Sequence, residues 1–318
     1  MNGSAWAPLP WQQQAWAQLA QARADDRLAH ALLVAGPRGV GKRHFVQGMA
    51  AALLCESPAA DGRACGRCRG CVQHAAGQHP NFLRLEPEEG KRDIAIESVR
   101  ALIERLTLSS HYGGRKVAVL DPADTLNASG VNALLKTVEE PTAGSHLILV
   151  TERLMTLAAT LRSRCQILRL GAPPAAQAET WLAQQHPDVP ATRRQAYAHA
   201  PLRLAETQAE GWAERREAWR RVLVAASDGQ AAAAIKGLDR IKKEEAEALL
   251  AWLIEETAAA LRASVSGSHE PSALGRLGAA RLSELSEQAV DGLRALAGNA
   301  NPQLLVESLM IRLAQRNQ

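Results

Sequence analysis

The stretch GPRGVGKRHF (Gly36–Phe45) follows the apolar run HALLVAG and indicates how the first half of the chain folds. An apolar strand that ends in glycine, then G-x-x-x-x-G-K, then a helix is the context of a phosphate-binding loop. The sequence predicts the strand at 30–36 and the helix at 42–54. Four residues would form the loop: Gly36, Gly39, Gly41 and Lys42. The stretch therefore predicts a P-loop-like α/β fold.

The loop departs from a working nucleotide site at its last position. Arg43 stands where a Ser or Thr hydroxyl would bind Mg²⁺, and a guanidinium has five donors and no acceptor. Asp121 ends a predicted strand, as the metal-binding carboxylate of a second motif would, but Pro122 replaces the Glu that would orient water. Asp124 is expected in a turn or a helix cap. The fold is predicted to remain while the hydrolytic groups are lost.

Whether nucleotide still binds is left open by these residues. Lys42 and the backbone amides can hold phosphates without Mg²⁺, or Arg43 can fold over the empty site.

Strands and helices alternate through the first part of the chain. Further strands are predicted at 80–87, 115–121, 145–152 and 165–170, and helices at 11–24, 94–106 and in NALLKTVEEP before Pro141. This alternation indicates a parallel sheet covered by helices on both faces.

After GAPP (171–174) the pattern becomes helical throughout. Bundle helices are predicted at 246–263 and 301–315, with a Gly/Ser-rich loop at 264–272 between two of them. A small helical unit at 171–210 and a larger one from 211 would fit the pattern. The expected fold class is therefore α/β plus all-α.

Composition sets broad limits. At 318 residues the chain is long enough for two or three domains, and its net charge of +4 is too weak to indicate nucleic-acid binding by itself. No apolar run reaches the roughly 20 residues that span a bilayer, and no secretory signal is visible. The sequence predicts a soluble, cytoplasmic protein without a membrane partner.

Four of the five cysteines form the pattern C-x9-C-x2-C-x2-C. In a reducing cytosol, thiolates at such spacing can close a tetrahedral shell around Zn²⁺ with no position left for water. We therefore predict one structural zinc ion, with Cys165 outside the site as a small buried residue. Its ligands would be Cys55, Cys65, Cys68 and Cys71.

Three later motifs carry a family resemblance: NALLKTVEEP (Asn132–Pro141), LILVTE (Leu147–Glu152) and LRSRC (Leu161–Cys165). With the four-cysteine module after the P-loop helix, the run 36–170 resembles bacterial clamp-loader subunits of the AAA+ superfamily. Its altered nucleotide motifs resemble those of the delta-prime subunit family of DNA polymerase III.

The resemblance implies an AAA+ core at 1–170 with a zinc module at 55–71, a helical lid at 171–210 and a helical collar at 211–318. Such a subunit is similar to a rigid arm in a five-subunit ring with gamma or tau and delta subunits, which loads the sliding clamp onto primed DNA. It is not expected to hydrolyse ATP by itself.

The resemblance also implies roles for single residues. In the motif Ser163-Arg164-Cys165, Arg164 would be an arginine finger that reaches the ATP of a neighbouring gamma or tau subunit. Thr151 falls at the first sensor position, and Arg203 resembles the second sensor.

Two other functions remain in competition at this point. One is an active gamma- or tau-type ATPase, against which Arg43 and Pro122 stand. The other is a zinc-dependent nucleic-acid-binding protein, with which three arginines beside the cysteines agree: Arg63, Arg67 and Arg69.

Overall fold

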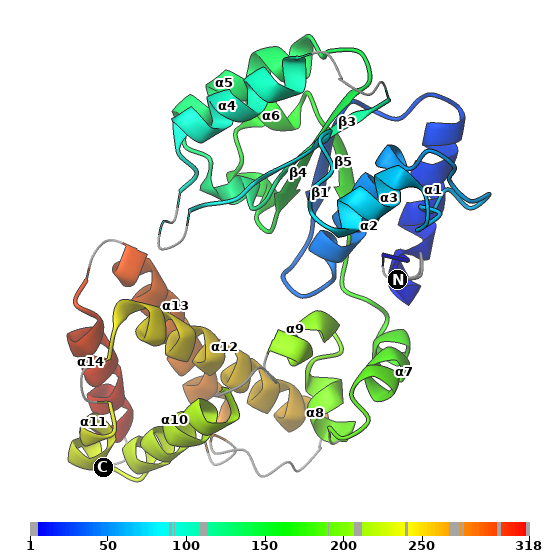
Figure 1. The fold of residues 1–318 in the computed structure, drawn as a ribbon. Coiled ribbons are helices and arrows are strands. Elements are labelled where there is room, and N and C mark those ends of the chain that lie inside the picture. The colour runs from blue at the N-terminus through cyan, green and yellow to red at the C-terminus, as the bar shows by residue number, and fades with distance from the viewer. Residues whose placement is uncertain are drawn as a thin grey trace. The chain divides into compact units, whose positions relative to one another are not determined.

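A computed structural model describes residues 6–88, 91, 93–108, 114–189, 191–206, 212–238, 241–266, 274, 277–297 and 300–315. The chain forms two compact units, Met1–Leu204 and Ala205–Gln318 (Figure 1). Among the described residues, no helix combines the length and apolar character needed to span a membrane.

The first unit contains a five-stranded parallel sheet with the order β2-β3-β4-β1-β5. The strands are β1 (Ala31–Ala35), β2 (Phe82–Leu85), β3 (Lys116–Leu120), β4 (Ser145–Thr151) and β5 (Gln166–Arg169). All five lie within the segments predicted from the sequence. β1 pairs with β4 and β5, which places the residues after β1 beside the ends of both neighbouring strands.

Both faces of this sheet are apolar, as a parallel sheet buried on two sides requires. Along β1, Leu33 packs into one hydrophobic cluster and Leu32 and Val34 pack into the other. In β4, Leu149 and Ile148 alternate in the same way. The alternation follows from the two-residue period of a strand.

Helices cover each face (Figure 1). On one face lie α4 (Ile96–Thr107), α5 (Ala128–Glu139) and α6 (Ala159–Arg162). On the other lie α1 (Gln13–Ala24) and α2 (Lys42–Leu54), followed by α3 (Arg69–Ala75). The predicted α/β core is therefore confirmed, although α3 and α6 were not predicted because both are too short for helical periodicity.

Three short helices follow the sheet: α7 (Ala175–Gln185), α8 (Ala191–Ala196) and α9 (Pro201–Glu206), and the first unit ends within α9, at Leu204. Their buried residues Leu182, Val189 and Leu204 form a small cluster of their own. The division of this unit at residue 170 into a core and a lid stays a prediction, since the compact unit extends to Leu204.

The second unit is all α-helical. It contains α10 (Trp212–Ser227), α11 (Ala231–Lys236), α12 (Lys243–Ser266), α13 (Ala279–Ala297) and α14 (Pro302–Gln315). Residues 264–266, predicted as part of a loop, lie in α12 instead, and the rest of that predicted loop lies outside the described residues.

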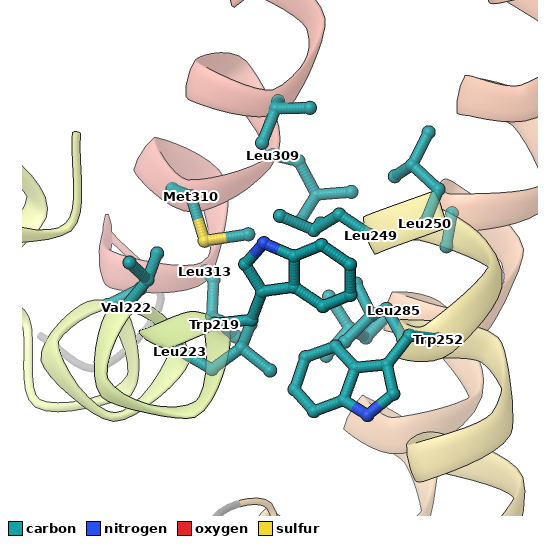
Figure 2. Packing of buried hydrophobic residues seen from close by; sticks show 14 of the residues in the cluster. Trp219, Val222, Leu223, Leu249, Leu250, Trp252, Leu285, Leu309, Met310 and Leu313 are labelled. Atoms are coloured by element: carbon teal, nitrogen blue, oxygen red, sulfur yellow. The ribbon is translucent and has the colours of Figure 1, made fainter. Parts of the chain in front are cut away.

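Two tryptophans mark the core of this helical unit. Trp219 of α10 and Trp252 of α12 lie with their ring centroids 5.5 Å apart. Figure 2 shows leucines of α12 and α14 and Met310 around them. The predicted all-α C-terminal part is confirmed.

Candidate functional site

The P-loop joins the end of β1 to the start of α2, and its backbone needs glycine at two positions. Gly39 and Gly41 have φ angles of +82° and +90°, a conformation that other L residues rarely adopt. Gln12, which is fully buried, donates hydrogen bonds from Nε2 to the carbonyl oxygens of Val40 and Gly41, both at 3.0 Å. The loop is therefore held from outside by a residue 28 positions earlier in the chain.

Helix α9 lies directly against the same loop. The Leu202 amide donates to the carbonyl of Gly39 at 3.1 Å, and a Cβ on Gly39 would lie 2.5 Å from Cγ of Arg203. Arg203, which resembles the second sensor in sequence, is thus next to the P-loop. Its action on a nucleotide stays a prediction.

Arg43 and Asp121 meet beside the loop. The Arg43 Nε donates to Oδ2 of Asp121 at 2.6 Å. Asp121 directly follows β3, and its side chain is only 6% exposed, whereas that of Arg43 is 65% exposed. The guanidinium therefore neutralises the carboxylate that the second nucleotide motif would present to a metal ion.

The ammonium group of Lys42 is buried within the P-loop. Nζ donates to the carbonyl of Pro37 at 2.8 Å and lies 3.7 Å from Oε1 of Glu152. Burial lowers the pKa of Lys42, and the carboxylates of Glu152, Asp121 and Asp124 oppose that shift. The charge is thus compensated without an anionic ligand.

Asp124 is engaged at the end of β4. Its carboxylate accepts from the Thr151 hydroxyl at 2.7 Å and from the amides of Glu152 and Arg153 at 2.8 and 3.2 Å. The Asp124 carboxylate therefore contacts the distant end of β4 and does not cap its own short helix, Ala123–Thr125, so it does not fill the expected turn or cap role. Thr151 is fully buried, and its hydroxyl faces this carboxylate.

Arg164 lies in the turn between α6 and β5. Its side chain is 39% exposed and makes two contacts within the chain. Nε donates to Oε1 of Glu139 at 2.5 Å, and Nη1 donates to the carbonyl of Thr160 at 3.0 Å. Its motif neighbour Cys165 is buried in the sheet core, which raises the pKa of the Cys165 thiol to about 11.

The four predicted metal ligands come together. The Sγ atoms of Cys55, Cys65, Cys68 and Cys71 all lie within 4.8 Å of one another. The Cys55–Cys68 and Cys65–Cys71 sulfur pairs are 3.8 and 3.9 Å apart. A tetrahedron with Zn–S bonds of about 2.3 Å has sulfur–sulfur edges of about 3.8 Å. The four residues therefore fit a tetrahedral metal ion.

Backbone amides point at three of these sulfurs. The amides of Cys65, Cys68 and Cys71 donate to the Sγ atoms of Cys55, Cys65 and Cys68, at 3.2, 3.4 and 3.4 Å. Amides of Arg67 and Cys68 lower the pKa of Cys65 to about 6, whereas burial raises the pKa of Cys55 and of Cys71. Such donors favour the thiolate, which is the form that binds a metal.

Two comparisons give the family of this chain. A family model described as DNA polymerase III, delta subunit, matches residues 11–174, slightly more than half of the chain. The chain is 32% identical to the DNA polymerase III subunit delta' of Escherichia coli K12, over 96% of this chain and 94% of that protein. The chain belongs to the DNA polymerase III delta-prime subunit family. The resemblance to the delta-prime family seen in the sequence is confirmed.

Other relatives agree over shorter stretches. The delta-prime protein of Pseudomonas aeruginosa is 44% identical over 57% of this chain and 54% of that protein, so this alignment spans about half of the relative. A solved DNA polymerase III gamma subunit-related protein of Thermotoga maritima has a TM-score of 0.55 over 96% of this chain and all of that chain. At 15% identity it shares the fold with this delta-prime family member.

Several residues of these sites had no predicted role, among them Gln12, Glu139 and Glu152. Gln12 supports the P-loop, and Glu139 binds the guanidinium of Arg164. Glu139 stands in the quoted motif NALLKTVEEP. Its charge is opposite to that of Arg164, and this was the one feature of the sequence that could have indicated the pair. Gln12 carries no local signal because its partners are distant in the sequence.

Proposed function

We propose that this chain is a non-hydrolysing subunit of the DNA polymerase III clamp loader, within the holoenzyme. Its neighbours would be gamma or tau and delta subunits in a five-membered ring, with 171–210 as the lid and 211–318 as the collar. The assembly would load the sliding clamp onto primed DNA during replication. Membership of the delta-prime family over nearly the whole chain supports this role.

The observation that carries the non-hydrolysing part is the ion pair of Arg43 with Asp121. A phosphoryl-transfer site needs a metal ion held by a hydroxyl and a carboxylate, and a residue that orients the attacking water. Here the carboxylate holds a guanidinium, the hydroxyl is missing and Pro122 cannot orient water. Asp124 does not replace these groups because it is engaged with Thr151 and two amides.

Arg164 would act on the ATP of a neighbouring subunit. An arginine finger stabilises the charge that develops on the transferred phosphoryl group and is worth on the order of 10³–10⁵ in rate in the GTPase cases. The partly exposed Arg164 side chain, in a turn at the end of α6, agrees with such a role. Ser163 and the buried Cys165 would hold the turn on either side.

The cysteine cluster would hold one structural Zn²⁺ through its four thiolates. Because the four ligands complete a tetrahedron, the ion would supply stability and no catalytic chemistry. A chain that presents Arg164 to the ATP of a neighbouring subunit needs to be rigid. The metal would stiffen the segment 55–71, which lies beside α2.

Two alternatives receive less support. An active gamma- or tau-type ATPase would need the metal site that Arg43 occupies. A zinc-dependent nucleic-acid-binding protein could use the exposed Arg63, Arg67 and Arg69, but delta-prime family membership over 96% of the chain favours the clamp-loader role.

A reconstituted clamp loader tests the proposal. Wild-type chain mixed with gamma or tau and delta subunits should co-elute as one complex with DNA- and clamp-stimulated ATPase. Arg164→Ala should assemble equally well but lower ATPase and clamp loading, in part only, since one ATP site faces this chain. Normal loading by the Arg164→Ala complex would exclude the trans role, and failure of the wild-type chain to join the complex would exclude the subunit role.

A further inference from the structure

The side chain of Arg164 is held from two sides by its own chain. Glu139, the last residue of α5, accepts from Nε at 2.5 Å, and the carbonyl of Thr160 in α6 accepts from Nη1 at 3.0 Å. The ion pair joins residues 25 positions apart, and the two elements that carry them are packed on the same face of the sheet.

This arrangement uses two of the five guanidinium donors. An arginine has five donors in a planar fork and contacts phosphate oxygens in pairs. Glu139 takes the Nε donor and Thr160 takes one Nη1 donor. Among the described residues, Nη2 makes no hydrogen bond, so its two donors are left for an external oxyanion.

We propose that Glu139 is a positioning residue for Arg164, which orients the guanidinium toward the ATP of the neighbouring subunit. This inference rests on the trans role proposed above for Arg164. A long side chain loses up to about 2 kcal/mol of rotamer entropy when it is ordered. Glu139 and Thr160 order it before the neighbour's ATP arrives, so less of that cost falls on the catalytic step.

The pair contributes to orientation more than to folding. Both side chains are partly exposed, at 39% for Arg164 and 47% for Glu139. Exposed ion pairs stabilise a fold by about 0–1 kcal/mol at most. Removal of Glu139 should therefore leave the fold intact and change the geometry of the finger alone.

A neighbouring acidic residue offers a matched control. Glu140 follows directly, is exposed and carries the same charge, but it makes no ion pair with an arginine among the described residues. If only the local negative charge mattered, Glu139→Ala and Glu140→Ala would have similar effects. If the contact to Nε matters, only Glu139→Ala will change the rate.

The experiment compares four variants in the reconstituted clamp loader: Arg164→Ala, Glu139→Ala, Glu139→Gln and Glu140→Ala. The rate lost in Arg164→Ala defines the Arg164-dependent part of the stimulated ATPase. Glu139→Ala should reduce that part about tenfold through kcat, with KM for ATP unchanged, since a misplacement of about 1 Å can cost up to ~10² in rate. Glu139→Gln keeps an acceptor oxygen and should retain most of the rate. Glu140→Ala should match wild type.

The outcomes separate this inference from the proposed function. If Arg164→Ala has no effect, the trans role itself is wrong. If Arg164→Ala lowers the rate but Glu139→Ala matches wild type, only the positioning role of Glu139 is wrong. A faster complex with Glu139→Ala would mean that Glu139 restrains the finger, which also overturns the inference. Equal unfolding midpoints of Glu139→Ala and Glu140→Ala would exclude a folding defect.

Discussion

Arg43 and Asp121 form an ion pair whose two members differ in exposure. The Arg43 Nε lies 2.6 Å from Oδ2 of Asp121, and the side chains are 65% and 6% exposed. Loss of the arginine would leave a buried carboxylate without its charged donor, whereas loss of the carboxylate charge would leave an arginine that water can solvate.

This difference predicts unequal effects of two substitutions. Arg43→Ala should lower the free energy of unfolding by about 1–3 kcal/mol because a buried charged group loses its hydrogen bond. Asp121→Asn should cost less, since no buried charge remains. Urea unfolding followed by circular dichroism measures both. A larger loss for Asp121→Asn would show that Arg43 is not the group that compensates Asp121.

The purified chain should not hydrolyse ATP in the presence of Mg²⁺. Arg43→Thr should also remain inactive, because Pro122 still supplies no group to orient water. Phosphate release, measured beside an active gamma- or tau-type subunit, checks both expectations. Turnover by the wild-type chain at a rate comparable with that control would contradict the proposed role.

The cysteine cluster should hold about one zinc ion per chain when the protein is purified without added metal. Cys68→Ser should lose the ion and melt at a lower temperature, since metal binding and folding of such a segment are coupled. Cys165→Ser is the matched control, because Cys165 lies in the sheet core and should keep the zinc. Elemental analysis of the wild-type chain and the two variants measures their zinc content. Unchanged zinc content in Cys68→Ser would rule out the site.

The clamp-loading rate should depend on the shape of the side chain at position 164 as well as on its charge. Arg164→Lys should rescue clamp loading poorly, since an ammonium lacks the planar fork that contacts phosphate oxygens in pairs. Arg162→Ala should have a smaller effect than Arg164→Ala, because Arg162 contacts the sulfur of Met155 instead. Clamp-loading rates of the reconstituted complexes test this, and equal losses for both alanine variants would contradict it.

His74 should make stability depend on pH. The ring is 5% exposed between Trp6 and Phe82, at centroid distances of 5.1 and 4.5 Å, and burial with the nearby charge of His79 lowers its pKa to about 4. The unfolded value is about 6.5, so the folded state favours the neutral ring. Stability is therefore fully present above about pH 6.5 and is lost as pH falls toward 4.

The measurement compares wild type with His74→Phe, which keeps a ring in place but cannot titrate. Between pH 7 and 5 the wild type should lose about 2 kcal/mol more unfolding free energy than the variant. Because both proteins keep the cysteines and the carboxylates, the difference reports the titration of His74 together with its coupling to His79. Parallel pH profiles would show that the ring is not held neutral.

The sequence alone determined those elements whose conformation depends on residues close to them in the chain. The P-loop helix α2 begins at Lys42 and ends at Leu54 as predicted, because its glycine entry and apolar face are encoded within one segment. The cysteine cluster was equally predictable, since three of its four ligands lie within seven residues and the geometry of zinc dictates the rest.

Tertiary structure decided which distant residues complete each site. The sheet order brings Asp121 from β3 to Arg43 at the start of α2, and packing of α5 beside α6 brings Glu139 to Arg164. Gln12 reaches the P-loop from the N-terminal segment in the same way. No local pattern encodes these pairs because each depends on how separate elements pack. Residue types could indicate where the nucleotide motifs are altered, and only the fold determined which side chains meet there.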